Sequence, residues 1–233
     1  MNILLLDAAN TIIEKKGLWN AYLSVLSDHH LKVDANTLRR NHKIISEMIS
    51  FPDRTDKAFY DHFNSNLLYS VGIIPNDHLL DEIFHACRSL PWEPCPDAHW
   101  LNHLTLDIAV LSNFHHGLEK ILGDLFPGVF SNIIDSEKER VRKPEGRFFQ
   151  RAMEILSFEP SEVIYVGDSL KLDIAPALKA GFNAWLVDRD DDYPCFSRKI
   201  RSLKEISDIL LDQNRPLSAS SHGNPRQSGE GLV

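Results

Sequence analysis

Near the start of the chain stands Ile3-Leu4-Leu5-Leu6-Asp7-Ala8-Ala9-Asn10-Thr11, in which four apolar residues run directly into a carboxylate and a polar turn. Three later runs, at residues 108–111, 163–166 and 184–187, have the same length and the same lack of polar alternation. A weaker fifth run at 130–134 precedes Asp135. Short apolar runs of this kind are typical of parallel strands that are covered on both faces.

Apolar residues at helical spacing separate these runs. Two such stripes lie at 118–125 and 148–156, and a third consists of Ile174, Ala177 and Leu178. The third is followed by Gly181, a residue type that commonly ends helices. Because strand and helix patterns alternate, the sequence predicts an α/β fold, a Rossmann-like parallel sheet with helical crossovers.

The segment from residue 14 to residue 93 breaks this alternation and shows only helical stripes, at 18–26, at 44–49 (Ile44, Ile45, Met48 and Ile49) and at 79–84. We therefore expect a core of residues 1–13 and 94–212, with an all-helical cap inserted at 14–93. The last residues, 213–233, are rich in Ser, Gly and Pro. They cannot bury enough apolar surface to order themselves, so we expect a flexible tail.

Composition restricts the partners. The 233 residues carry 25 Lys and Arg against 33 Asp and Glu, a net charge of −8, which argues against nucleic acid or membrane because both prefer a basic face. The three cysteines, Cys87, Cys95 and Cys195, form no CxxC pair, which favours a reducing compartment. The first apolar run is too short for a signal peptide, and no run approaches the roughly 20 apolar residues of a membrane span. We expect a cytoplasmic protein.

Polar side chains follow three of the apolar runs. Asp7 follows the first run, Ser112 the run at 108–111, and Asp168 the run at 163–166, while Lys143 stands before a predicted helix. Ligands of open parallel sheets bind outside the carboxyl ends of the strands, so these groups are expected at one edge of the sheet. Mg²⁺ is usually held by one or two carboxylates together with phosphate oxygens. The pattern therefore indicates a magnesium and phosphate site in which an Asp can act as the nucleophile.

These residues resemble the four motifs of the haloacid dehalogenase (HAD) superfamily, in order and with fitting spacing: 7–11 (Asp-Ala-Ala-Asn-Thr), 112–113 (Ser-Asn), 143–144 (Lys-Pro) and 167–173 (Gly-Asp-Ser-Leu-Lys-Leu-Asp). The resemblance covers the core from residue 2 to about residue 188. The helical insertion is similar to the cap of that superfamily's phosphatase-like subgroup.

The resemblance implies a role for each matching residue. Asp7 would be the nucleophile, and Lys143 would neutralise Asp7 and the bound phosphate. Ser112 would hydrogen-bond the phosphoryl oxygens, with Asn113 and Thr11 from the same motifs beside the substrate. The implied partner is a small phosphorylated metabolite, whose identity the sequence does not give; nor does it give the oligomeric state.

The resemblance also implies the metal ligands. Asp7, Asp168 and the backbone carbonyl of Ala9 would coordinate Mg²⁺, with Asp173 as a further ligand or as an anchor behind the ligands. The acidic run at 188–192 is interpreted as a solvated loop and not as a second metal site.

Ala9 is the departure from the family pattern, because phosphatases of this family carry there a second Asp that protonates the leaving oxygen. Loss of a positioned general acid/base typically costs about 10²–10⁴-fold in rate. A phosphatase with an atypical acid step, a phosphonatase-like C–P hydrolase, a dehalogenase and a weakly catalytic phosphometabolite-binding or regulatory protein all stay open. The phosphonatase needs a cap lysine, for which Lys32, Lys43 and Lys57 are available, whereas the acidic metal motif at 167–173 opposes a dehalogenase.

Overall fold

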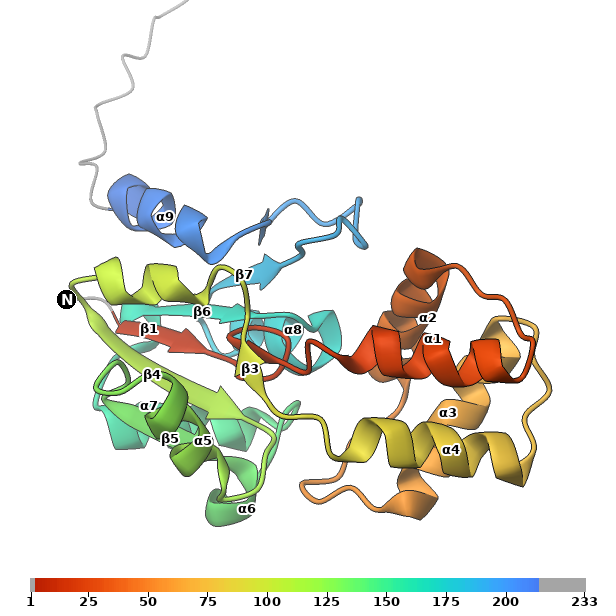
Figure 1. Cartoon of the computed structure of the whole chain (residues 1–233). Helices are drawn as coiled ribbons and strands as arrows, with labels where there is room; N and C mark the ends of the chain where they lie inside the picture. The colour runs from red at the N-terminus through yellow and green to blue at the C-terminus, as the bar shows by residue number, and fades with distance from the viewer. Residues whose placement is uncertain (1–2, 214–233) are drawn as a thin grey trace, which may run out of the picture.

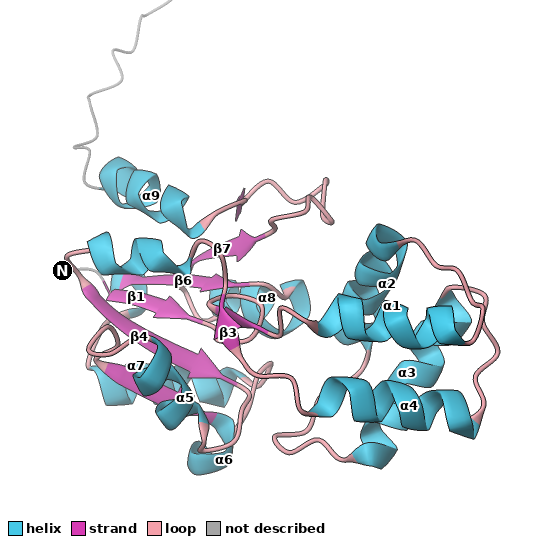
Figure 2. Cartoon of the chain, viewed as in Figure 1, coloured by secondary structure: helices cyan, strands magenta, loops and turns pink. Residues whose placement is uncertain are grey.

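The computed structural model describes residues 3–213 and contains a six-stranded parallel sheet in the order β5-β4-β1-β6-β7-β8 (Figure 2). The strands are β1 (Ile3–Leu6), β4 (Asp107–Ser112), β5 (Asn132–Asp135), β6 (Val163–Gly167), β7 (Asn183–Val187) and β8 (Lys199–Ile200). The predicted Rossmann-like sheet is confirmed. Strand β8 was not predicted, because a two-residue strand carries no periodic signal.

Alternate residues of each strand pack against different helices. Leu4 and Leu6 of β1 share an apolar cluster with α5 (Leu118–Leu125) and α9 (Ile206–Gln213). Ile3 and Leu5 share a second cluster with α7 (Gly146–Leu156) and α8 (Ala175–Lys179). The sheet is therefore covered on both faces, which explains why its strands lack polar alternation.

Four helices form a separate body beside the sheet, which we call the helical unit (Figure 1). They are α1 (Leu18–Asp28), α2 (Ala35–Met48), α3 (Lys57–Ser70) and α4 (Asp77–Arg88). The side chains of Asp34, Asp56 and Asn76 accept the backbone N–H groups that begin α2, α3 and α4. The unit has its own apolar cluster, which includes Tyr22, Leu38, Phe63 and Ile83.

A short antiparallel ribbon joins the helical unit to the sheet. Strands β2 (Ile13–Glu14) and β3 (Glu93–Pro94) pair Ile13 with Pro94 and Glu14 with Glu93. The boundaries expected at residues 14 and 93 fall within this ribbon. Both connections therefore leave the core at one place, which is the geometry that a hinge requires.

Two predicted apolar stripes are partly wrong. Ile44 and Met48 of α2 are 46% and 70% exposed, because a different face of this helix, that of Lys43 and Glu47, contacts the core. Leu178 at the end of α8 is also exposed, since only Ile174 and Ala177 of that stripe face the sheet.

Two further expectations concern the remaining chain. The expected flexible tail, 213–233, lies outside the described residues, apart from Gln213 at the end of α9. Within residues 3–213 no helix has the length and apolar character that crossing a membrane requires. The shorter elements are α6 (Ser136–Glu139) and the short helical segments Ala98–His103, Pro160–Glu162, Leu170–Ile174 and Leu203–Glu205.

Candidate active site

Asp7 lies at the carboxyl end of β1, in the middle of the sheet, and is buried. Its backbone N–H donates to the carbonyl of Val166 at 2.9 Å, which ties the end of β1 to that of β6. Ser112 Oγ donates to Asp7 Oδ1 at 3.0 Å, and Thr11 Oγ1 lies 3.4 Å from Asp7 Oδ2. The structure thus brings both predicted hydroxyl groups to the Asp7 carboxylate.

Lys143 reaches Asp7 from the loop before α7. Its Nζ lies 2.6 Å from Asp7 Oδ1, 2.6 Å from Asp173 Oδ1 and 3.3 Å from the hydroxyl of Tyr165. The Asn113 side chain holds the Lys143 backbone from both sides, donating to its carbonyl at 2.9 Å and accepting its N–H at 2.8 Å. Asn113 therefore positions Lys143. Its motif places Asn113 beside the substrate and does not predict this contact.

Asp173 is bound through both carboxylate oxygens. Oδ1 accepts from Lys143 and from Tyr165 Oη at 2.7 Å, and Oδ2 accepts the Ser169 N–H at 3.0 Å. Gly167 makes this approach possible, because a Cβ at that position would lie 2.4 Å from Asp173 Cγ. These contacts describe a carboxylate that holds Lys143 and the turn after β6.

Charge and burial act together at the centre of the site. Burial, reinforced by Asp173 and Asp168 and opposed by Lys143, raises the pKa of Asp7 to about 6. Burial alone would lower the pKa of Lys143, but Asp173 and Asp7 raise it above its usual value. Lys143 is therefore an ammonium at neutral pH, held between two carboxylates.

Asp7, Asp168 and Asp173 form a cluster of carboxylates that could hold a metal ion. Each offers a carboxylate oxygen, and the three oxygens lie within 4.8 Å of one another. Hard oxygen ligands at the end of a parallel sheet are the donors that Mg²⁺ prefers. The residues therefore fit this ion.

Asp168 also has a partner from the helical unit. Lys43 Nζ donates to the Asp168 carboxylate and, at 2.6 Å, to the Asp168 carbonyl. Of the three lysines considered for the insertion, Lys43 is at this site, whereas Lys57 pairs with Asp61 and Asp81 within the helical unit.

Some site residues were missed by sequence reasoning. Tyr165 stands inside an apolar run, and its hydroxyl, which needs a polar partner when buried, was the available signal. Arg189 belongs to the acidic run at 188–192, yet its guanidinium binds Asp97 at 2.7 Å and the carbonyls of Asn10 and Thr11 at 2.8 Å each. The interpretation of that run as a solvated loop is confirmed for the exposed Asp190 and Asp191 but wrong for Asp188, which is buried, and for Arg189, which holds the turn after Asp7.

The fold and the site together define a class of protein: a Rossmann-like α/β protein whose acidic groups and lysine meet at the carboxyl ends of parallel strands, beside a helical insertion. A family model for haloacid dehalogenase-like hydrolases matches residues 1–181, and the chain belongs to this family. The resemblance stated from the four motifs is confirmed.

Curated relatives include both phosphatases and a dehalogenase. Haloacid dehalogenase-like hydrolase domain-containing protein 3 of Danio rerio is 33% identical over 121 residues, 49% of this chain and 50% of that protein. Glyceraldehyde 3-phosphate phosphatase of Methanocaldococcus jannaschii is 31% identical over 88 residues, 35% and 38% of the two chains. (S)-2-haloacid dehalogenase H-109 of Pseudomonas putida is 26% identical over 181 residues, 72% and 77%. The chain thus matches half, or less, of the first two relatives' length.

Solved structures extend the likeness to most of the described chain. The HAD-hydrolase YfnB of Bacillus subtilis, solved bound to magnesium, has a TM-score of 0.64 at 24% identity and covers 90% of this chain and 98% of its own. A 2-haloacid dehalogenase from Pseudomonas syringae has a TM-score of 0.56 at 20% identity, covering 91% and 99%. Likeness at these identities establishes the shared fold.

Proposed function

We propose that this hydrolase is a Mg²⁺-dependent phosphatase of a small phosphorylated metabolite. One observation carries the proposal: Asp7, Asp168 and Asp173 present carboxylate oxygens within 4.8 Å of one another while Lys143 bridges two of them. Magnesium, when bound, would neutralise charge on the phosphoryl oxygens. The phosphatase names of several relatives agree with this reaction class.

The reaction would proceed in two displacements. The Asp7 carboxylate attacks phosphorus, the bond from phosphorus to the leaving oxygen breaks, and the leaving group departs as its oxyanion while the aspartyl-phosphate forms. Water then attacks that phosphorus, releasing inorganic phosphate and restoring the carboxylate. The Lys143 ammonium and the Ser112 hydroxyl, both already hydrogen-bonded to Asp7, would stabilise charge on the transferring group.

The ligand roles rest on the family resemblance and, for Asp173, on its hydrogen bonds. We assign direct metal contact to Asp7, to Asp168 and to the Ala9 carbonyl. Asp173, whose two oxygens already accept from Lys143, Tyr165 and Ser169, would instead hold Lys143 in place.

Ala9 restricts the substrates. It has no proton to give, so the leaving oxygen would take one from water or depart as the anion. Acyl and aryl phosphates have better leaving groups than alkyl phosphates. We therefore expect them to be the better substrates.

The helical unit would act as the cap over this site, in the boundaries 14–93. It contacts the core through ion pairs outside the centre, including Arg39 with Asp190 and Asp192 and Arg54 with Glu137. Closure excludes water from the reaction. The cytoplasm is the compartment that we propose.

A C–P hydrolase is the second candidate, because Lys43 of the helical unit lies at the site, where it contacts Asp168. Such an enzyme forms a Schiff base between a cap lysine and a 2-oxophosphonate. Although burial opposes its charge, Asp168 raises the pKa of Lys43, so that the ammonium and not the free amine is favoured in this arrangement. Borohydride trapping with phosphonoacetaldehyde separates the candidates: labelling of Lys43 would establish C–P hydrolysis.

Turnover of acetyl phosphate and of an aryl phosphate, with Mg²⁺ and with chelator, tests the proposal. We expect Mg²⁺-dependent turnover that Asp7→Asn abolishes. Absent turnover of both compounds, together with tight binding of a phosphorylated ligand, would identify a binding or regulatory protein instead.

A further inference from the structure

Helix α2 turns one face toward the core loop that follows β6. Lys43 and Glu47 stand one helical turn apart on this face, and both contact residues 168–171. They come from the helical unit, more than 120 residues away along the chain from the loop that they touch. The contact therefore exists only while the helical unit lies against the core.

Glu47 is the more heavily bonded of the two. Its carboxylate accepts four hydrogen bonds from the core, from Ser169 Oγ at 2.9 Å, the N–H groups of Leu170 and Lys171 at 3.1 Å each, and Tyr193 Oη at 3.2 Å. Hydrogen bonds to an ionised acceptor are the strong ones. Glu47 thus fixes the position of α2 on the loop.

Because Glu47 holds α2 against the loop, Lys43 lies next to Asp168. Its ammonium binds both the carboxylate and the carbonyl of Asp168, and the two side chains are only 19% and 15% exposed. An ion pair with so little exposure is weakly screened by salt. The Asp168 carboxylate, which the proposed function assigns to Mg²⁺, therefore already has a cation from the protein.

We propose that Lys43 and Glu47 form a latch in which the Lys43 ammonium and Mg²⁺ compete for Asp168, so that loading of the metal requires α2 to leave the loop. This inference rests on the proposed function, which supplies the metal site. It goes further in coupling metal binding to the position of the helical unit. Because coupling is reciprocal, Mg²⁺ would in turn favour release of the latch.

The size of the effect follows from the population of open molecules. The apparent dissociation constant of a ligand equals its intrinsic value divided by the competent fraction. If about one molecule in ten has the latch open, opening it in all of them tightens Mg²⁺ binding about tenfold.

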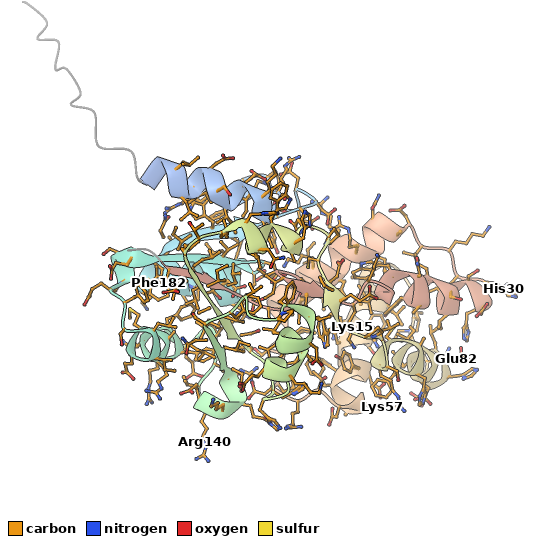
Figure 3. The ribbon with its side chains drawn as sticks, turned by 60° about the vertical axis from the view of Figure 1, so that its left-hand side comes forward. Lys15, His30, Lys57, Glu82, Arg140 and Phe182 are labelled. Carbon is orange, nitrogen blue, oxygen red and sulfur yellow. The ribbon has the colours of Figure 1, made fainter. Side chains whose placement is uncertain are left out.

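Calorimetric titration of the full-length chain with Mg²⁺ tests the role of Lys43. Lys43→Met, which keeps most of the length of the side chain but removes the charge, is expected to bind Mg²⁺ about tenfold more tightly than the parent. Lys57→Met makes the same charge change at another residue of the helical unit, labelled in Figure 3. It is the matched control, since Lys57 pairs with Asp61 and Asp81. We expect its affinity to be unchanged.

Glu47→Ala separates the latch from simple electrostatics, because the two give opposite signs. Removal of a negative charge near the metal would by itself weaken Mg²⁺ binding, whereas removal of the anchor of α2 tightens it. Glu154→Ala is the charge-matched control, as Glu154 is an exposed glutamate of α7 paired with Arg151. Hydrogen exchange at the N–H groups of Leu170 and Lys171, which Glu47 protects, should speed up in Glu47→Ala and, for the parent, on addition of Mg²⁺.

The outcomes distinguish the latch from the metal site beneath it. Mg²⁺ binding that is absent throughout, or that survives Asp168→Asn, overturns the metal site and the latch together. Binding that Asp168→Asn abolishes, but that Lys43→Met leaves unchanged or Glu47→Ala weakens, overturns the latch alone. Tighter binding in both latch variants, with unchanged controls, supports it.

Discussion

At the scale of single residues, the centre of the site is built at a cost in stability. Asp7 is buried beside two other carboxylates, which disfavours its charged form, and Lys143 offsets only part of this effect. The pKa of Asp7 therefore rises to about 6 from 3.8. A group whose pKa is raised on folding binds its proton more tightly in the folded state. For an acid this means that ionised Asp7 destabilises the protein above pH 6 and that the penalty fades as the pH falls toward 4.

Asp7→Asn should therefore stabilise the metal-free protein at pH 7.5 by about 1–3 kcal/mol, the equivalent of a shift of about two pKa units. The gain should shrink as the pH falls below about 6, because the parent carboxyl becomes neutral as well. Urea denaturation in chelator at pH 7.5 and pH 5 measures both values. A variant less stable than the parent at pH 7.5 would show that the ion pair with Lys143 outweighs the burial of Asp7.

Ala9 is the other residue with a distinct prediction. Ala9→Asp restores a proton donor beside the leaving oxygen and should raise kcat on an alkyl phosphate by about 10²-fold or more. The rate on acetyl phosphate, whose acetate leaving group departs without protonation, should change little and serves as the control. An unchanged alkyl phosphate rate would mean that another group or a bound water already supplies the proton.

At the scale of elements, the turn after β6 decides how the carboxylates are arranged. Gly167 ends the strand, and Asp173 folds back over it to meet Lys143, Tyr165 and the Ser169 N–H. No Cβ fits in this approach without moving Asp173. The glycine is thus required by packing and not by its backbone conformation.

Gly167→Ala should destabilise the protein by about 1–3 kcal/mol, as overpacking usually does, and should lower kcat by displacing Asp173 and with it Lys143. Gly146→Ala is the matched control, since a Cβ there meets nothing within 4 Å at the start of α7. Thermal denaturation and the aryl phosphate assay measure both effects. Equal behaviour of the two variants would contradict the close packing of Asp173 on Gly167.

At the scale of the whole molecule, the core was more predictable than the contacts of the helical unit. The four apolar runs and the polar residues that end them place Asp7, Ser112 and Asp168 at one edge of the sheet, because parallel strands end there together. Residues such as Lys43 and Glu47 bind core residues that are far away in the sequence. Their partners depend on how the helical unit packs against the core, and the spacing of apolar residues within one helix does not predict that packing.

The same reasoning explains the error in α2. The apolar residues Ile44 and Met48 suggested a buried face, but docking on the core gave the inner position to Lys43 and Glu47. Lys43 and Glu47 face the core because they bind polar groups of the loop after β6. The apolar pattern of α2 does not predict such contacts.

The central claim is that Asp7 carries the phosphoryl group during turnover. The most direct measurement is mass spectrometry of peptides from protein that is mixed with acetyl phosphate and Mg²⁺ and then quenched in acid. We predict one phosphoryl group on Asp7, absent in chelator and in Asp7→Asn. Steady turnover with no phosphoryl group on Asp7, or turnover that persists in Asp7→Asn, would contradict the account.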